Sequence, residues 1–241
     1  MSAPALEITQ LHAWYSESHI LHGLSLRVQP GQVLTLLGRN GAGRTTTLRA
    51  IMGLTGRRQG SIKVHGTETI ALPTHRIAHL GLGYCPEERG IFASLTTEEN
   101  LRLPPPLRRR QGTSPGKAMS EEQIYAMFPN LAERRHSPGT KLSGGEQQML
   151  AVARILRTGA DVLLLDEISE GLAPVIVQAL ARMITTLKSQ GFTIVMVEQN
   201  FRFAAPLADH FVVIEHGEVV ESFARAELDA KRAVLDELLS V

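Results

Sequence analysis

The sequence predicts an α/β fold with a mainly parallel core sheet, an N-terminal antiparallel β-subdomain and an inserted helical subdomain. The second half of the chain alternates short, nearly continuous apolar runs with longer helical stretches, which is typical of a parallel sheet covered on both faces. Near the start, a buried-type strand leads into a glycine-rich loop and then a helix, the order that a phosphate-binding unit requires. The rest of the first third consists of alternating runs joined by turns, which favours antiparallel pairing.

The elements of the first third follow from local patterns. Residues 6–15 alternate loosely and residues 23–28 strictly between apolar and polar side chains, as half-buried strands do. The Gln-Pro-Gly sequence at 29–31 predicts a turn, and the apolar run at 32–38 predicts a buried strand. The later elements predicted in this third are a helix at 45–54 and a hairpin at 60–69.

The middle of the chain, roughly residues 89–154, is predicted to be the helical insertion. Three consecutive prolines and further turn-forming residues between Pro104 and Lys117 predict a loop or a broken helix start. Within it, Arg108, Arg109 and Arg110 favour a solvated loop over a contact with lipid or a permease. Ser120 is a suitable N-cap, and acidic residues follow it, so a helix is predicted there.

The last third returns to alternating strands and helices, and the whole chain, 1–241, is predicted to be a single domain. A helix is expected to end at Gly159, and a later one at Gly191, because glycine favours the conformation that terminates helices. The predicted elements are helices at 146–159, 175–191 and 225–241, strands at 161–167 and 192–199, and a hairpin at 210–222.

Composition excludes several classes of function. Twenty-five Lys and Arg against 24 Asp and Glu leave a net charge of +1, which argues against nucleic-acid binding through bulk charge. Cys85 is the single cysteine, so no disulfide forms within the chain and a reducing compartment is expected. No apolar stretch approaches the ~18 residues of a membrane helix, and the N-terminus lacks the apolar core of a signal peptide. These features predict a cytoplasmic protein whose membrane contacts are peripheral.

The glycine-rich loop at Gly38–Thr46 is the first motif that carries chemistry. It fits the spacing G-x-x-x-x-G-K-[ST], except that Arg44 stands in place of lysine. Its glycines let backbone N–H groups turn inward toward phosphate, and Thr45 offers a hydroxyl to Mg²⁺. The alternative is a glycine turn before a helix. The predicted phosphate-site residues are Gly38, Arg39, Asn40, Gly41, Ala42, Gly43, Arg44, Thr45 and Thr46.

Two acids end the predicted strand at 161–167. Acids in that position are costly unless they face a cation or a ligand at the carboxyl edge of the sheet. We therefore expect Asp166 to help hold Mg²⁺ and Glu167 to polarise the attacking water.

The sequence LSGGEQQ at Leu142–Gln148 resembles the signature motif of the ATP-binding cassette (ABC) family. Together with the two earlier motifs, in family order and at family-like spacings, it implies an ABC-type P-loop fold and ATP hydrolysis. In that family two cassettes stack head to tail, and each signature covers the γ-phosphate held by the opposite chain. The resemblance therefore implies that the nucleotide held by the partner chain is bound by Ser143, Gly144, Gly145 and Glu146.

Three further positions fit the same resemblance. Tyr15 precedes Arg44 by the distance at which the family places an aromatic ring on adenine, and Trp14 is the alternative if the alignment shifts by one. Glu87 stands in the position of the glutamine-loop glutamine, and Gln199 in that of the switch histidine. A glutamine amide at this position can donate a hydrogen bond to the γ-phosphate but carries no proton or charge.

Gln199, together with ISEGLAP after the catalytic acid, makes the chain similar to one branch of the family, the second ATP-binding subunit of branched-chain amino acid importers. The resemblance implies ATP and Mg²⁺, permease subunits, a second cassette of the same or another kind, and indirectly a periplasmic solute-binding protein. It also implies a peripheral place on the cytoplasmic face of the inner membrane. Relatives that import urea and short amides are an open alternative.

A second alternative is a weakly hydrolysing cassette that completes a partner's ATP site. The three departures from the family pattern all fall on this chain's own phosphate site: they are Arg44, Glu87 and Gln199. The signature motif, in contrast, is intact. The retained Glu167 argues against it. A non-transport ABC ATPase with two cassettes or a coiled-coil arm does not fit 241 residues.

Overall fold

The computed structural model describes residues 3–107 and 117–239. Most of the predicted loop between Pro104 and Lys117, with Arg108, Arg109 and Arg110, lies outside the described residues. Over the two described ranges, no helix combines the length and the apolar character needed to cross a membrane.

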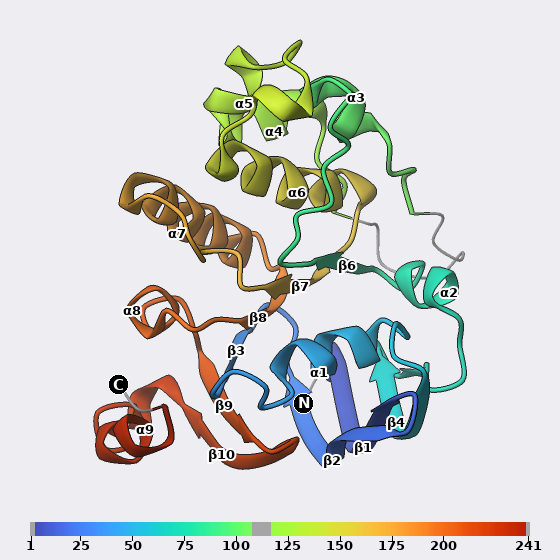
Figure 1. Cartoon of the computed structure of the whole chain (residues 1–241), viewed down its shortest axis with the longest axis vertical. Coiled ribbons are helices and arrows are strands. Elements are labelled where there is room, and N and C mark those ends of the chain that lie inside the picture. The colour runs from blue at the N-terminus through green and yellow to red at the C-terminus, as the bar shows by residue number, and fades with distance from the viewer. Residues whose placement is uncertain (1–2, 108–116, 240–241) are drawn as a thin grey trace.

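The predicted antiparallel β-subdomain is a four-stranded sheet in the order β2-β1-β4-β5 (Figure 1). Alternate residues of its first strand, such as Leu6 and Ile8, are buried on one face, as the sequence pattern predicts. The strands are β1 (Leu6–Tyr15), β2 (Ser18–Val28), β4 (Arg57–Val64) and β5 (Thr67–Glu68).

The core sheet has six strands in the order β10-β9-β3-β8-β7-β6, and all neighbours are parallel except the hairpin pair β9 and β10. Every residue of β3, β7 and β8 is buried, which explains their continuous apolar sequences. The strands are β3 (Val33–Leu37), β6 (Leu82–Cys85), β7 (Val162–Asp166), β8 (Thr193–Val197), β9 (His210–Glu215) and β10 (Glu218–Ala224).

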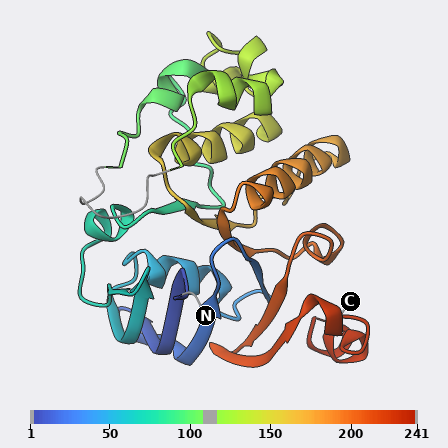
Figure 2. The same cartoon turned by 180° about the vertical axis from the view of Figure 1, so that it is seen from behind.

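The two faces of the core sheet bury different partners (Figures 1 and 2). Leu163 and Leu165 point into a cluster with helices α6 (Gly144–Thr158) and α7 (Pro174–Ser189). Leu164 points the other way, into a cluster with α1 (Arg44–Ile51) and the antiparallel sheet. Helix α1, which follows the phosphate loop in the sequence, therefore packs in the layer between the two sheets.

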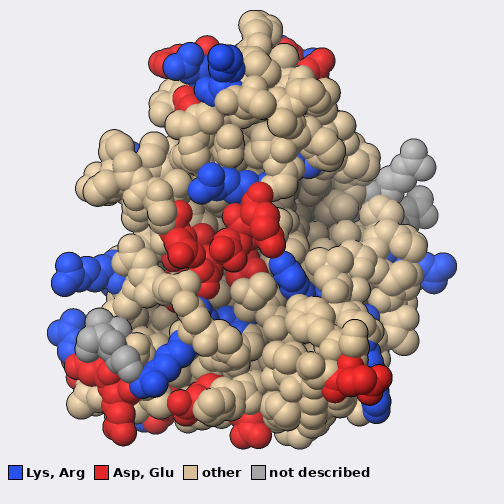
Figure 3. Space-filling model, viewed as in Figure 1, with Lys and Arg blue, Asp and Glu red and all other residues tan. Residues whose placement is uncertain are grey.

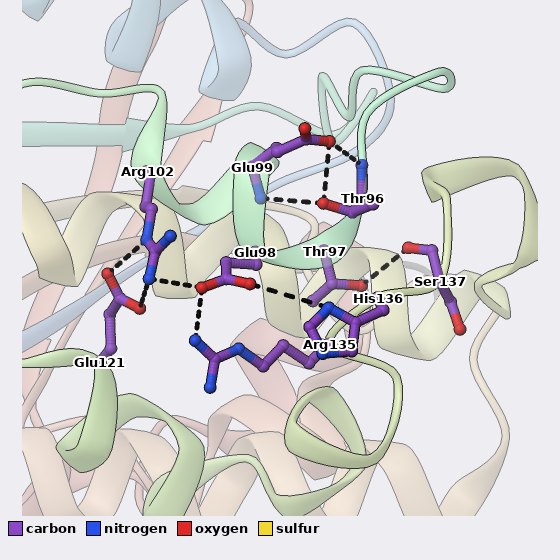
Figure 4. A network of polar contacts seen from close by, with 9 residues as sticks. All are labelled: Thr96, Thr97, Glu98, Glu99, Arg102, Glu121, Arg135, His136 and Ser137. Atoms are coloured by element: carbon purple, nitrogen blue, oxygen red, sulfur yellow. Dashed lines mark hydrogen bonds and ion pairs between the residues drawn. The ribbon is translucent and has the colours of Figure 1, made fainter.

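Three short helices pack above α6, within the stretch predicted to be helical. They are α3 (Thr97–Arg102), α4 (Glu121–Met127) and α5 (Pro129–Glu133). Ser120 caps α4 as predicted, with its hydroxyl accepting from the Gln123 N–H. Ion pairs join the short helices (Figure 4): Glu98 contacts Arg102 and Arg135, and Arg102 forms a two-pronged pair with Glu121.

Several elements differ from the sequence prediction. One continuous closing helix at 225–241 is wrong within the described residues: a 3-10 turn at Arg225–Glu227 precedes α9 (Arg232–Leu239). Leu228 packs against a buried cluster that includes Phe211 of β9 and Phe223 of β10, and the chain bends there before the helix starts. Short elements such as α2 (Thr74–Ala78) and α8 (Phe201–Ala204) carried no periodic pattern long enough to predict them.

Gly83 lets β6 lie directly against α6, and we expect Gly83→Ala to destabilise the fold. A Cβ at this position would lie 1.9 Å from Cγ2 of Ile155 on α6. Forcing the sheet and helix apart should lower the free energy of unfolding by about 1–3 kcal/mol, measured by urea denaturation. Gly56→Ala is the matched control, because its nearest contact would be 3.5 Å away. Equal stability of both variants would contradict the expectation.

Candidate functional site

The phosphate loop joins β3 to α1 and presents an open helix N-terminus. Gly41 and Gly43 have φ of 80° and 108°, a conformation that glycine adopts without the strain imposed by a side chain. No side chain caps the first N–H groups of α1, and no acidic residue lies in its first turn. These donors and the positive end of the helix dipole are thus available to an anion.

The Arg44 guanidinium is engaged by the protein itself. One of its nitrogens lies 3.1 Å from Glu167 Oε1 and from Asn40 Oδ1, and the other donates to the Glu198 carbonyl oxygen at 3.2 Å. The Arg44 and Glu167 side chains are 5% and 9% exposed, so water screens this ion pair little. Because the guanidinium already holds Glu167, phosphate must compete with that carboxylate for Arg44.

Glu167 is held from two sides in a strained backbone conformation. Its φ is +48°, which is uncommon for a residue with a side chain and is typical of functional sites. Its Oε1 contacts Arg44, and its Oε2 accepts a hydrogen bond from Gln199 Nε2 at 2.6 Å. The structure therefore brings the two residues predicted to be catalytic into direct contact.

Asp166 and Thr45 form an oxygen pair at the base of the loop. The Thr45 hydroxyl donates to Asp166 Oδ1 at 3.0 Å, and the Tyr84 hydroxyl donates to Oδ2 at 2.9 Å. Burial raises the pKa of Asp166, against the two hydrogen bonds that lower it. A hydroxyl and a carboxylate oxygen are the donors that Mg²⁺ prefers, so these residues fit a magnesium ion bound with nucleotide.

Carboxylates gather at the centre of the face seen in Figure 3. Oxygens of Glu87, Glu167 and Glu170 lie within 4.8 Å of one another. A hydrogen bond with Glu167 and, to a smaller extent, the loss of hydration raise the pKa of Glu170 to about 7. Together with the phosphate loop they line a cavity of about 330 Å³. Its lining residues are Asn40, Gly41, Ala42, Gly43, Arg44, Thr45, Thr46, Glu87, Glu167, Glu170 and Gln199.

The two aromatic candidates for adenine differ in their surroundings. Trp14 stacks on the His19 ring at 4.1 Å, and the Arg57 guanidinium lies 4.5 Å from the Trp14 ring centroid. Since β1 lies between the strands that carry His19 and Arg57, these side chains approach Trp14 from its two sides. Tyr15 instead forms a hydrogen bond with Arg49 of α1; hydrogen bonds with Tyr84 and, to a smaller extent, with Tyr15 raise the pKa of that guanidinium. Neither ring lines the cavity, so adenine stacking stays a prediction for Tyr15, with Trp14 as the alternative.

The signature residues sit at the N-terminus of α6, away from the cavity lining. Ser143 caps the helix by accepting from the Glu146 N–H, and the Glu146 carboxylate accepts from the Ser143 N–H at 2.7 Å. Glu146 therefore serves its own helix in this structure. Gly144 lies beside the Arg89 guanidinium, and Gly145 is buried where a Cβ would be 2.8 Å from Ile176 Cγ1.

Some residues around the cavity lie where sequence reasoning did not place them. The Arg39 side chain turns away from the cavity and donates to the carbonyl oxygens of Glu237 and Leu238 in α9. Glu170 and Glu198 were missed, although the acidic sequence DEISE and the acid before Gln199 are visible signals. Tyr84 was missed because its role depends on β6 lying beside β7.

Glu198 should make stability depend on pH. Burial raises its pKa to about 7, against hydrogen bonds from the Ser169 hydroxyl and N–H that lower it. The folded chain then binds this proton more tightly than the unfolded chain does, so the stabilisation present at low pH is lost as pH rises toward 7. We expect the parent to lose about 3 kcal/mol more than Glu198→Gln between about pH 4.5 and 7.

Urea unfolding at a series of pH values measures this difference. Glu133→Gln, at an exposed carboxyl group, is the control and should keep the slope of the parent. Parallel slopes for parent and Glu198→Gln would contradict the assignment.

Comparison with known proteins gives consistent matches. The ABC transporter family profile matches residues 21–170. The chain is 36% identical over 234 residues to the high-affinity branched-chain amino acid transport ATP-binding protein BraG of Pseudomonas aeruginosa, covering 97% of this chain and 99% of that protein. It is 34% identical to the probable branched-chain amino acid transport ATP-binding protein LivF of Archaeoglobus fulgidus, covering 92% and 93%.

Two further similarities concern another transport system and the fold. The lipopolysaccharide export system ATP-binding protein LptB of Haemophilus influenzae is 31% identical, with 86% of this chain and 85% of that protein covered. Among solved structures, a nucleotide-free ATP-binding cassette from an ABC transporter superposes with a TM-score of 0.83 at 20% identity, covering 99% of each chain. The predicted α/β fold with its antiparallel β-subdomain and parallel-rich core sheet is confirmed.

Proposed function

The chain belongs to the ABC transporter family of ATP-binding proteins, and on that premise we propose that its ATP hydrolysis drives the import of branched-chain amino acids. The observation that carries the choice of solute is the similarity to BraG over nearly the whole of both chains, joined by the similarity to LivF. LptB, at a lower identity, belongs to an export system, so export of a lipid is the result that the transport test must exclude.

We propose that the cavity binds the phosphates of ATP. The open N–H groups of α1 would hold the β- and γ-phosphates, and Arg44 would join them once phosphate replaces Glu167 as its partner. Thr45 and Asp166 would hold Mg²⁺, which when bound supplies positive charge against the phosphate oxygens.

Release from Arg44 would leave the Glu167 carboxylate free to orient the attacking water. Gln199, already 2.6 Å from Glu167, would keep the carboxylate in place and donate to the γ-phosphate. In this scheme the ion pair in the described structure is a resting arrangement that nucleotide opens. Glu87, at the cavity wall, would offer a carboxylate oxygen to the Mg²⁺ bound with the nucleotide.

The signature at the start of α6 would serve a second chain. Ser143, Gly144 and Gly145 do not line the cavity of their own chain, which suits a head-to-tail pair in which each signature covers the partner's γ-phosphate. The partner cassette would be a second copy or another ABC ATPase subunit. Permease subunits would hold the pair at the cytoplasmic face of the inner membrane, and a periplasmic solute-binding protein would deliver the solute.

The Arg44–Glu167 ion pair also favours a second candidate, a cassette that hydrolyses ATP slowly and mainly completes a partner's site. In that case the pair would persist with ATP bound, because the wider guanidinium would stay on the carboxylate rather than the phosphate. The two candidates differ in the turnover of this chain's own site.

Transport by the purified complex tests the proposal. The chain would be co-purified with its membrane partners and reconstituted in vesicles, and ATP-dependent uptake of leucine, urea and a short amide would be measured with the binding protein present. We expect leucine uptake. Uptake of urea or the amide alone, or extraction of lipopolysaccharide without uptake of any solute, would overturn the proposed substrate. Undiminished transport after Glu167→Gln in this chain alone would favour the slow cassette.

A further inference from the structure

The loop after β6, residues 86–90, is tied to the signature helix by two arginines. Arg89 Nε donates to Oε1 of Gln148 on α6 at 3.1 Å, and Arg154 of α6 donates to the Gly90 carbonyl oxygen at 2.6 Å. The Gln148 amide is itself buried and donates to Cys85 Sγ at 3.6 Å. The loop that brings Glu87 to this chain's cavity is thus fixed to the helix whose start would serve the partner's nucleotide.

The tip of the Arg89 side chain lies over the first residue of that helix. A Cβ on Gly144 would be 3.0 Å and 3.5 Å from the two terminal guanidinium nitrogens of Arg89. Within residues 3–107 and 117–239, the hydrogen bonds and ion pairs of the structure engage Nε of Arg89 but neither terminal nitrogen. Arg89 also adopts a left-handed φ of +60°, which is uncommon for a residue with a side chain.

This placement puts a cation beside the positive end of a helix dipole, in a helix whose first turn holds one acid, Glu146. The N-terminus of the 15-residue helix α6 carries the positive end of the dipole, and a guanidinium beside it adds charge of the same sign. An anion between the two would convert repulsion into attraction from both. A phosphate oxygen suits the position, because the terminal N–H groups of arginine can bind phosphate with two parallel hydrogen bonds.

We propose that Arg89 binds the γ-phosphate of the ATP held by the partner chain, beside Ser143 and Gly144. The inference rests on the proposed head-to-tail pair of cassettes. Arg89 would then belong to the partner's nucleotide site while its neighbour Glu87 lines the site of its own chain. One short loop would contact both nucleotides, so binding of ATP in one site would help to order the other.

The test separates nucleotide binding by one chain from closure of the pair. All variants carry Glu167→Gln to prevent hydrolysis, and are studied alone and with the cassette that co-purifies in the transporter. ATP affinity is measured by fluorescence at low protein concentration, and association by light scattering during an ATP titration. For Arg89→Ala we expect single-chain affinity within about twofold of the parent but at least about tenfold more ATP for half-maximal association. Arg89→Lys should recover part of the loss, because it restores the charge.

Arg154→Ala is the matched control, because Arg154 anchors the same loop to the same helix without approaching Gly144. Equal association defects in Arg154→Ala and Arg89→Ala, with no recovery in Arg89→Lys, would show that Arg89 only holds the loop against α6. That result would overturn the proposal. Association of Arg89→Ala at parental ATP concentrations would also overturn it while leaving the proposed function intact. If the Glu167→Gln parent itself fails to associate in either setting, the head-to-tail pair fails, and the role of Arg89 fails with it.

Discussion

Glu167→Gln should reduce phosphate release from this chain's site by about 10²–10⁴-fold while ATP still binds. The substitution keeps the size and hydrogen-bonding reach of the side chain but removes the negative charge that orients water. In the structure that charge is also the partner of Arg44. Losing it should leave the guanidinium free for phosphate, so ATP affinity should equal or exceed that of the parent.

Phosphate release by the transporter complex, with the partner's own site disabled, measures this effect, and calorimetry measures ATP affinity. Glu170→Gln is the matched control: it alters a neighbouring acid of the same cavity, whose raised pKa already leaves it partly protonated near pH 7. A Glu167→Gln complex that releases phosphate at the parental rate would exclude Glu167 as the water-orienting residue.

Arg44→Ala should weaken ATP binding by roughly ten- to a hundredfold, the loss expected for one charge-assisted hydrogen bond of about 1.5–3 kcal/mol. The buried Glu167 carboxylate would also lose its cation, so the melting temperature of the variant should fall. Arg44→Lys should change affinity much less, since lysine is the residue expected at this position of the motif.

Titration of ATP against the parent and both variants, by fluorescence or calorimetry, decides the role of Arg44. Parental affinity in Arg44→Ala would mean that the guanidinium stays on Glu167 when ATP binds. This result would favour the second candidate, a cassette that hydrolyses ATP slowly, because the carboxylate needed for water activation would remain paired with Arg44.

The sequence predicts the parts of this molecule whose cause is local. The buried strands β3, β7 and β8 follow from apolar runs, and the phosphate loop follows from its glycine spacing and the helix after it. The two acids at the end of β7 could be placed at the carboxyl edge because parallel strands end together there.

Other features depend on contacts between distant segments. Glu170 reaches the cavity because the chain turns back after Glu167, and the Arg44 guanidinium turns toward Glu167 and Glu198 rather than outward. No spacing rule fixes such directions, since they depend on which strand neighbours which in the folded sheet. The closing helix was predicted too long for the same reason. Its amphipathic pattern continues through residue 228, where packing of Leu228 bends the chain.

The hydrogen bonds between Arg39 and α9 have a practical consequence. Arg39 follows Gly38 at the start of the phosphate loop, and its guanidinium binds the backbone carbonyl oxygens of Glu237 and Leu238 in α9. A substitution that shifts this turn of α9 would therefore move the partners of Arg39, and through it the start of the loop. A fluorescent probe for nucleotide-binding measurements therefore belongs away from α9.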